Sequence, residues 1–346
     1  MAQQDIRVAV LGLGRLGMFH ASNMMNKVKG AELTLICDPI VEHAERAADQ
    51  LGVPAWTADP EEVFENPDID AVVIVTPTST HADMIKQAAA HGKQIFVEKP
   101  LTSTIEEADE VIEAVKKADV ICQVGFMRRY DPGYFDAKQR IDAGEIGKPI
   151  YFKGFTRDSG SPPASFIKNS GGIFLDCSIH DYDIARYLMS SEISSVSGHG
   201  RILMNPFMEE YNDVDQAITY LEFENGGAGD VEASRNSPYG HDIRAEIIGT
   251  EGAIFVGSLR NSDVTVQSST GSNHEIVPNF QMRFREAYVQ ELEQFIKCVK
   301  GEESPRVTSV DSKINMQVAL AATRSYMNNG ERINMQELYQ DKVYVL

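Results

Sequence analysis

Apolar runs alternate with amphipathic segments through the first third of the chain. Ile6–Leu11 and Leu33–Cys37 are short apolar runs, and Arg15–Lys29 between them has the spacing of a helix. Near-continuous apolar strands separated by amphipathic helices are typical of a parallel sheet that is covered on both faces. Further strands are expected at Ala71–Val75, Gln94–Val97 and Val120–Val124, and further helices at Val41–Leu51, Thr80–His91 and Thr104–Lys117. The pattern predicts a doubly wound α/β domain over residues 1–124.

The pattern changes after residue 124. A strand is expected at Pro149–Arg157, and four longer strands then follow in succession, at about Val196–Leu203, Ala217–Glu222, Gly229–Arg235 and Arg244–Ile248. Turn residues such as Asn225-Gly226-Gly227 separate them, which is typical of antiparallel pairing. Helices are expected at Asp136–Ala143, Ile173–Met189, Arg283–Lys300 and Ser309–Asn328. Residues 125–346 are therefore predicted to form an α+β domain with an open, mainly antiparallel sheet, whose last helices are able to pack back on the first domain.

Length and charge narrow the class of protein. A chain of 346 residues suffices for about two domains, and no apolar run approaches the roughly 18–20 residues that span a bilayer. The net charge of −19 argues against nucleic acid or an anionic membrane as a partner, because either would need a basic patch. The N-terminus has no signal-peptide pattern, and the four cysteines are far apart in apolar segments. We therefore expect a cytoplasmic protein with reduced thiols and no zinc site.

A glycine motif follows the first apolar run. Gly12-Leu13-Gly14-Arg15-Leu16-Gly17 has the G-x-G-x-x-G spacing, directly after a strand and at the start of a helix. There Gly12 permits a tight turn, Gly14 lets the backbone approach a pyrophosphate, and Gly17 lets the helix pack closely on the strand. The motif predicts a Rossmann domain that binds a dinucleotide. A glycine turn that binds nothing is the alternative.

Asp38 ends the second predicted strand. A carboxylate at this place accepts hydrogen bonds from the adenosine ribose and repels a 2′-phosphate, which favours NAD over NADP. The alternative is a helix N-cap before Pro39, and the two roles are compatible.

Two more motifs follow predicted parallel strands, at the sheet edge where ligands bind. Thr76-Pro77 is expected to contact the dinucleotide, and the nearby His81 has either a structural or a cofactor-adjacent role. Glu98-Lys99-Pro100 places Lys99 near a bound nicotinamide, where an ammonium group can stabilise a developing alkoxide. A surface lysine is the alternative, although Pro100 fixes the chain direction where Lys99 leaves the strand.

Three ionisable residues interrupt an otherwise apolar segment of the second domain. Asp176, His180 and Asp183 stand at i, i+4 and i+7, which places them on one face of the predicted helix Ile173–Met189. Ionisable groups on a buried helix are costly unless they are paired or functional. The cluster is a proton-transfer site, a metal site or a salt-bridged helix, with Asp183 and Arg186 as the ion pair in the last case.

These motifs together resemble the glucose–fructose oxidoreductase/inositol dehydrogenase/rhizopine catabolism family over nearly the whole chain. The resemblance rests on the glycine motif, Glu98-Lys99-Pro100, the Asp176/His180 helix and Gly125-Phe-Met-Arg-Arg-Tyr130. Three stretches are similar in detail to the myo-inositol 2-dehydrogenase branch: residues 125–134, 239–249 and 283–288. The stretch His180-Asp-Tyr-Asp183 departs from the expected His-Glu-Ile-Asp, and the loop at 157–170 matches poorly.

The resemblance implies roles for individual residues. It implies a catalytic triad of Lys99, Asp176 and His180, with His180 as the base and no metal. The cofactor contacts expected are Gly12, Leu13, Gly14, Arg15, Leu16, Gly17, Asp38, Thr76, Pro77, His81, Glu98 and Lys99. The substrate contacts expected are Lys99, Arg128, Arg157, Asp176, His180, Asp183 and Tyr239. The alternative for Arg128 and Arg129 is that they pair with Asp131 or other surface acids. The alternative for Tyr239 is that it packs in the core.

The activity implied is NAD-dependent oxidation of a ring hydroxyl of a cyclic polyol to a ketone. The expected substrate is myo-inositol, with scyllo-inositol or a pyranose as alternatives. A homo-oligomer, dimer or tetramer, is expected, because in this family such sheets pack face to face between subunits. A non-catalytic NAD-binding regulator and a redox-assisted glycoside hydrolase that keeps its NAD bound are the other hypotheses.

Overall fold

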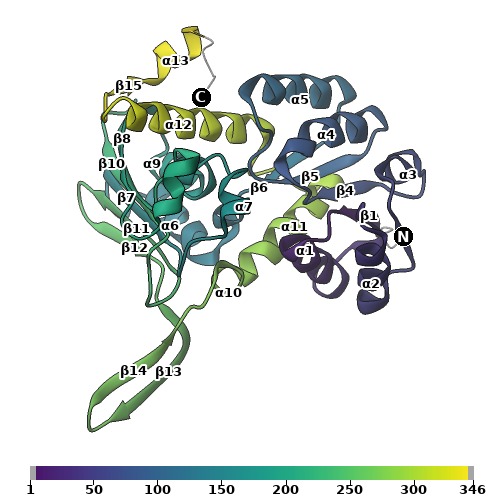
Figure 1. Ribbon diagram of the computed structural model, residues 1–346, viewed down its shortest axis with the longest axis horizontal. Coiled ribbons are helices and arrows are strands. Elements are labelled where there is room, and N and C mark those ends of the chain that lie inside the picture. The colour runs from purple at the N-terminus through teal and green to yellow at the C-terminus, as the bar shows by residue number, and fades with distance from the viewer. Residues whose placement is uncertain (1–4, 342–346) are drawn as a thin grey trace. The chain divides into compact units, whose positions relative to one another are not determined.

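The computed structural model describes residues 5–341, which fall into two compact units (Figure 1). The first unit contains the chain up to Tyr130 together with Glu286–Lys313, and the second contains Asp131–Arg285 together with the chain from Ile314 onward. The predicted division after residue 124 stays a prediction. Within residues 5–341, no helix combines the length and the apolar character that a membrane crossing requires.

The first unit is built on a six-stranded parallel sheet with the order β3-β2-β1-β4-β5-β6. This is the Rossmann sheet that the apolar runs predict. Its strands are β1 (Ile6–Leu11), β2 (Ala31–Cys37), β3 (Ala55–Thr57), β4 (Ala71–Ile74), β5 (Gln94–Glu98) and β6 (Cys122–Gly125). The connections carry α1 (Arg15–Asn26), α2 (Val41–Leu51), α3 (Pro60–Glu65), α4 (His81–Ala90) and α5 (Ile105–Ala118).

A late helix completes the core of the first unit. Helix α11 (Arg285–Val299) contributes Leu292, Phe295 and Ile296 to the cluster that surrounds β1 and β4. The ring of Phe295 packs edge-on against Phe96 of β5, with centroids 5.9 Å apart. Burying an aromatic or aliphatic side chain of this size contributes about 1.5–3 kcal/mol. Residues almost 200 positions later in the chain therefore help to hold the sheet.

The second unit is built on a seven-stranded sheet with the order β12-β11-β7-β10-β9-β8-β15. Only β7 and β10 pair in parallel, so the predicted mainly antiparallel sheet is confirmed. Its strands are β7 (Pro149–Arg157), β8 (Ile193–Arg201), β9 (Gln216–Phe223), β10 (Ala228–Ser234), β11 (Asp242–Gly249), β12 (Ala253–Val256) and β15 (Ile333–Asn334). The helices are α6 (Pro132–Asp142), α7 (Ala164–Ile167), α8 (Ile173–Asp176), α9 (Ile179–Met189), α10 (Phe280–Arg283), α12 (Ser309–Met327) and α13 (Met335–Asp341).

Helix α9 covers one face of this sheet. The Thr156 hydroxyl on β7 donates to the Asp181 carboxylate at 2.6 Å, and the hydroxyls of Tyr182 and Thr219 are 2.8 Å apart. Side chains alternate along a strand, so neighbours of Thr156 and Thr219 point to the opposite face. That face carries a mixture of charged and exposed apolar side chains. A hairpin of β13 (Arg260–Ser268) and β14 (Gly271–Ile276), which the sequence pattern did not predict, projects from the unit (Figure 1).

The single helix predicted over Ile173–Met189 is wrong. The chain forms α8 and α9 with a break at Cys177 and Ser178. The backbone N–H groups of both residues donate to the Ile173 carbonyl, at 3.0 and 3.1 Å, which makes a wide turn. The Ser178 carbonyl then accepts from Asp181 and Tyr182 to begin the next helix. Asp176 and His180 therefore lie on successive short helices.

Two glycines allow α1 to pack against the sheet. A β-carbon at Gly17 would lie 1.8 Å from the Gly12 carbonyl oxygen, and one at Gly12 would lie 2.7 Å from the Val75 carbonyl oxygen. Gly12 also has a φ of +89°, a conformation that other residues rarely adopt. The approach of α1 to β1 and β4 therefore requires glycine at both positions.

Replacing Gly17 with alanine tests this packing. Alanine within a helix normally stabilises it by about 1 kcal/mol relative to glycine. Here the added methyl would overlap the Gly12 carbonyl, so we expect the free energy of unfolding to fall by about 1–3 kcal/mol. Thermal denaturation measures the change, with Gly160→Ala as the control because a β-carbon there would meet no atom within 4 Å. Equal denaturation midpoints for the two variants would contradict the close packing.

Candidate active site

The glycine loop places the start of α1 at the carboxyl edge of the first sheet. Gly14 is the N-cap of α1, and a β-carbon there would meet no protein atom within 4 Å. Protein packing therefore does not explain this glycine, whereas Gly12 and Gly17 are explained by contacts. The first amides of a helix lack partners within the helix and bind anions well. The loop thus fits a dinucleotide pyrophosphate.

Asp38 supports the glycine loop from the end of β2. Its Oδ2 accepts a hydrogen bond from the Leu13 N–H at 2.8 Å, and its Oδ1 accepts one from the Ile40 N–H at 3.0 Å. The side chain is buried, and the N-cap of α2 is Ile40. The alternative interpretation of Asp38 as the N-cap of that helix is therefore wrong. Its carboxylate connects two loops at the edge of the sheet.

Hydrogen bonds join the chain after β4 to the chain after β5. The buried ring of His81 lies between the Thr76 carbonyl, 2.9 Å from Nε2, and the Pro100 carbonyl, 3.0 Å from Nδ1. Burial lowers the pKa of His81, so near pH 7 the ring is neutral and its single N–H donates to one of these two carbonyls. The hydroxyls of Thr76 and Thr80 are 2.7 Å apart. His81 therefore holds the two strand ends together, and its expected contact with the cofactor stays a prediction.

Glu98 and Lys99 follow each other at the end of β5 but differ in surroundings. Glu98 is buried, with Oε1 at 2.7 Å from His20 Nε2, and its Oε2 accepts from the Lys99 N–H at 3.3 Å. Lys99 is half-buried, and the peptide between Lys99 and Pro100 is cis. The carboxylate thus fixes the backbone from which the lysine extends.

In the second unit, Asp176 pairs with a buried arginine that sequence reasoning missed. Arg235 directly follows β10, is 1% exposed, and donates from Nη2 to Asp176 Oδ2 at 3.1 Å. Burial opposes the charge on Arg235, but Asp176, Asp213 and other acidic neighbours hold its pKa above the usual value. Asp176 is therefore held beside a permanent cation, with 19% of its side chain exposed. His180 is half-buried in the first turn of α9.

Asp183 is fully buried, and its contacts run to α12. Its Oδ1 accepts a hydrogen bond from the Asn315 side-chain amide at 2.8 Å, and the Asn315 side-chain oxygen accepts from Arg186 at 2.8 Å. Arg186 also forms a two-pronged ion pair with Glu192, at 2.6 and 2.8 Å. Asn315 thus bridges the two residues that the sequence suggested as an ion pair. Asp183 belongs to a buried network, and its substrate contact stays a prediction.

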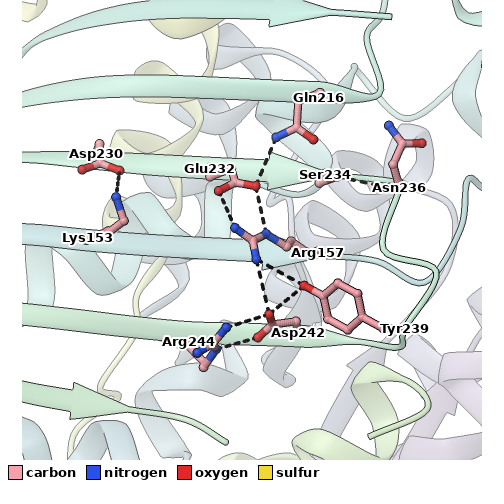
Figure 2. Close-up of polar contacts among 10 residues, drawn as sticks. All are labelled: Lys153, Arg157, Gln216, Asp230, Glu232, Ser234, Asn236, Tyr239, Asp242 and Arg244. Atoms are coloured by element: carbon pink, nitrogen blue, oxygen red, sulfur yellow. Dashed lines mark hydrogen bonds and ion pairs between the residues drawn. The ribbon is translucent and has the colours of Figure 1, made fainter. Parts of the chain in front are cut away.

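Arg157 and Tyr239 lie on the sheet face opposite to α9. Figure 2 shows Arg157 between Glu232, at 2.7 Å, and Asp242, at 3.5 Å, and Tyr239 donates to Asp242 at 2.9 Å. Since Thr156 points toward α9, its neighbour Arg157 points away from it. The structure therefore does not bring these two residues to the side of the sheet that α9, with His180, covers. Their expected substrate contacts stay predictions.

The predicted arginine pair is placed in the first unit. Arg128 is 1% exposed in the turn after β6, and Arg129 contacts the Arg306 carbonyl at 3.0 Å and Asp311 at 3.4 Å. Asp131, the partner suggested by the sequence, instead pairs with Arg283 at 2.8 Å. The substrate contact expected of Arg128 stays a prediction.

Asp176, His180 and Asp183 do not bring their ligand atoms within 4.8 Å of one another, as a shared metal ion would require. Among the described residues, the one group whose ligand atoms all lie within 4.8 Å is His20, Glu98 and Glu291. The spacing of residues in the sequence does not predict this cluster, because its members come from α1, β5 and α11. The one feature of the sequence that could have pointed to it is the acidic residue Glu291 among the buried apolar positions of α11.

Comparison with known proteins agrees with both halves of this arrangement. Residues 6–126 match a model of the oxidoreductase family with an NAD-binding Rossmann fold, and residues 138–335 match that family's C-terminal alpha/beta domain. The chain is 64% identical to a scyllo-inositol 2-dehydrogenase (NAD(+)) of Bacillus subtilis, over 94% of this chain and 95% of the relative. It is 37% identical to a myo-inositol 2-dehydrogenase of Thermotoga maritima, over 92% of this chain and 96% of the relative.

A solved structure has the same fold throughout. It is scyllo-inositol dehydrogenase from Lactobacillus casei with bound NAD(H) and scyllo-inositol. The two chains superpose with a TM-score of 0.91 at 30% identity, over 96% of this chain and 100% of that one. The chain therefore belongs to the glucose–fructose oxidoreductase/inositol dehydrogenase/rhizopine catabolism family of NAD-binding oxidoreductases.

Proposed function

We propose that the protein oxidises one ring hydroxyl of an inositol to a ketone, with NAD as the hydride acceptor. The observation that carries the proposal is the ion pair of Asp176 with the buried Arg235, just before His180 in the chain, in a chain 64% identical to a scyllo-inositol 2-dehydrogenase. The similarity favours scyllo-inositol as the preferred isomer, with myo-inositol as a further substrate because myo-inositol enzymes are also among the relatives.

In the proposed mechanism, His180 takes the hydroxyl proton of the substrate. Neutral imidazole suits this task because its pKa lies near the working pH. Asp176, paired with Arg235, orients the imidazole or accepts a hydrogen bond from a neighbouring ring hydroxyl. Lys99 donates to the reacting oxygen and stabilises the charge that develops on it. When bound, NAD supplies the redox chemistry, and the protein supplies position and charge.

The residues of the first unit fit the cofactor that the mechanism needs. The open space at Gly14, the helix start behind it and the carboxylate of Asp38 are the groups that would hold pyrophosphate and adenosine ribose. We assign the loop residues Gly12 and Leu13 to the same cofactor site, together with Arg15, Leu16 and Gly17 in the first turn of α1. Thr76, Pro77 and His81 would lie along the nicotinamide side, and the buried Glu98 would support this side through the Lys99 backbone rather than by touching the cofactor.

We also propose that the protein is a homo-oligomer that acts in the cytoplasm. Gln216 and Arg244 lie on the sheet face shown in Figure 2. Strand alternation and pairing place exposed apolar side chains on the same face: Ile218 and Tyr220 on β9, Ile248 on β11 and Phe255 on β12. Such a mixed face suits contact with a second copy of the chain. The four cysteines are buried thiols rather than disulfides, which fits a reducing compartment.

A substrate panel tests the reaction. We expect NADH absorbance to rise when the protein is mixed with NAD and scyllo-inositol, and more slowly with myo-inositol. NADP should support at most a small fraction of the NAD rate, because the Asp38 carboxylate repels a 2′-phosphate. Turnover of glucose with neither inositol isomer oxidised would overturn the proposal.

Replacing His180 tests the base. We expect His180→Ala to lower kcat by about 10²–10⁴-fold, the usual contribution of a positioned base. NADH binding, followed by fluorescence, should stay within about threefold, because the change removes proton transfer rather than a cofactor contact. His274→Ala on the exposed hairpin is the matched control and should leave both quantities unchanged. A His180→Ala variant with wild-type kcat would exclude this role.

Replacing Arg235 tests the charge that faces Asp176. Arg235→Met would leave two carboxylates, Asp176 and Asp213, near a buried position without their cation. We expect a loss of about 3–5 kcal/mol in the free energy of unfolding, and a lower kcat in the protein that still folds. Arg260→Met, at an exposed position of β13, should change neither. If the two variants unfold at the same temperature, Arg235 does not stabilise the pair.

A further inference from the structure

Three ionisable side chains from three elements of the first unit meet behind the Glu98-Lys99-Pro100 segment. They are His20 on α1, Glu98 on β5 and Glu291 on α11, with one ligand atom of each within 4.8 Å of the others. His20 and Glu291 are 0% exposed and Glu98 is 6% exposed. Two carboxylates cannot both remain charged in such a place without compensation, so the cluster needs an assignment of its protons.

The position of Glu98 is shaped for its carboxyl group. It is in contact with His20 Nε2 at 2.7 Å and with the Lys99 N–H at 3.3 Å. A β-carbon at Gly125, on the neighbouring strand β6, would lie 3.0–3.1 Å from the carboxyl atoms. Glycine at 125 therefore makes room for this group. The carboxylate has a ring nitrogen at one oxygen and a backbone N–H at the other.

Glu291 has the opposite surroundings. Neither of its side-chain oxygens has a hydrogen-bond partner among the described residues. Burial, and then the charge of Glu98, raise the pKa of Glu291 well above its usual range. The other ionisable groups nearby include His20 and the phenols of Tyr288 and Tyr130, both of which burial keeps neutral. The guanidinium groups of Arg128 and Arg15 act on the Tyr288 phenol, but neither lowers the pKa of Glu291 within the described part of the chain, so its carboxyl is neutral.

The hydrogen bonds also settle the state of His20. In the described part of the chain, Nδ1 of His20 is buried and has no partner. A proton on Nδ1 would leave a buried donor unsatisfied, which costs about 1–3 kcal/mol. The single proton of the neutral ring therefore lies on Nε2 and is donated to Glu98.

A proton explains the cluster better than a metal ion does. A histidine that binds a metal almost always donates its second N–H to an acceptor, and Nδ1 of His20 has none within the described residues. Both oxygens of Glu98 are already engaged by N–H groups.

We propose that this cluster carries one negative charge, on Glu98, and that Glu98 is a positioning residue for Lys99. Its Oε2 holds the backbone N–H of Lys99, and its Oε1 holds His20, which lies on the helix that begins at the glycine loop. The carboxylate thus links the cofactor-binding helix to the lysine, while Glu291 stays a neutral neighbour. This inference rests on the proposed role of Lys99 at the reacting oxygen.

Two isosteric variants separate the roles of the two acids. Glu98→Gln removes the charge and turns an amide toward at least one of the two N–H donors, so we expect kcat with scyllo-inositol to fall at least about 10-fold. The KM for NAD and the binding of NADH should change by less than about threefold, because the effect is on the lysine. Glu291→Gln copies a neutral acid, and we expect its kcat to stay within about twofold of wild type.

Thermal stability gives a second readout that does not depend on activity. Because the folded-state pKa of Glu291 is raised, its contribution to stability is present below its unfolded pKa and is lost as pH rises toward the folded value. Glutamine cannot ionise, so the Glu291→Gln variant does not lose this stability as the pH rises. We therefore expect its denaturation midpoint to match wild type near pH 4, below the ordinary pKa of a glutamate, and to exceed it increasingly up to pH 8.

Several results would overturn the inference. They are an equal loss of kcat in both variants, an unchanged kcat in Glu98→Gln, or a midpoint difference that does not grow with pH. A stoichiometric divalent metal in the purified protein, removed by Glu291→Gln, would replace the proton assignment with a metal site. If Glu98→Gln does not fold, His20→Leu, which removes the donor to Oε1, should show the same fall in kcat. If wild type oxidises no inositol, the proposed function fails, and the thermal comparison still tests the charge assignment.

Discussion

The contact between Gly17 on α1 and Gly12 after β1 is the constraint on which the first unit depends. With hydrogen atoms alone at both positions, the helix lies directly against the sheet, and any β-carbon would overlap a carbonyl. The start of α1 thereby reaches the carboxyl edge, where anions bind. One turn later the same helix delivers His20 to Glu98 at the end of β5. The cofactor loop and the lysine motif are consequently parts of one rigid arrangement.

In both units, an acidic side chain of the proposed site is held by a hydrogen-bond donor with a fixed position. Asp176 has the buried guanidinium of Arg235, and Glu98 has the imidazole N–H and a backbone N–H. Glu291 behaves differently, because neither of its oxygens has a hydrogen-bond partner among the described residues and burial raises its pKa. The mechanism uses the first kind of acid, because an orienting carboxylate must keep its charge near a base.

Sequence patterns predicted the elements of local origin and missed those that depend on distant partners. The Rossmann sheet and the glycine loop are readable because strand periodicity and glycine spacing are local properties. The break between α8 and α9 was missed, since helical spacing continues through Cys177 and Ser178 while the hydrogen bonds do not. Arg235 and Glu291 meet their partners only after folding, and no spacing relates them to Asp176 or Glu98. The family resemblance also did not show on which face of the sheet Arg157 lies. That depends on strand alternation: Thr156 points toward α9, so Arg157 points away from it.

The central claim is that the chain transfers hydride from an inositol carbon to NAD. Mass spectrometry of the NADH formed from scyllo-inositol carrying deuterium on every ring carbon tests it directly. We expect one deuterium in each NADH molecule and a ketone product that has lost one ring deuterium. NADH without deuterium, or no NADH at all from the labelled and the unlabelled inositol, would contradict it.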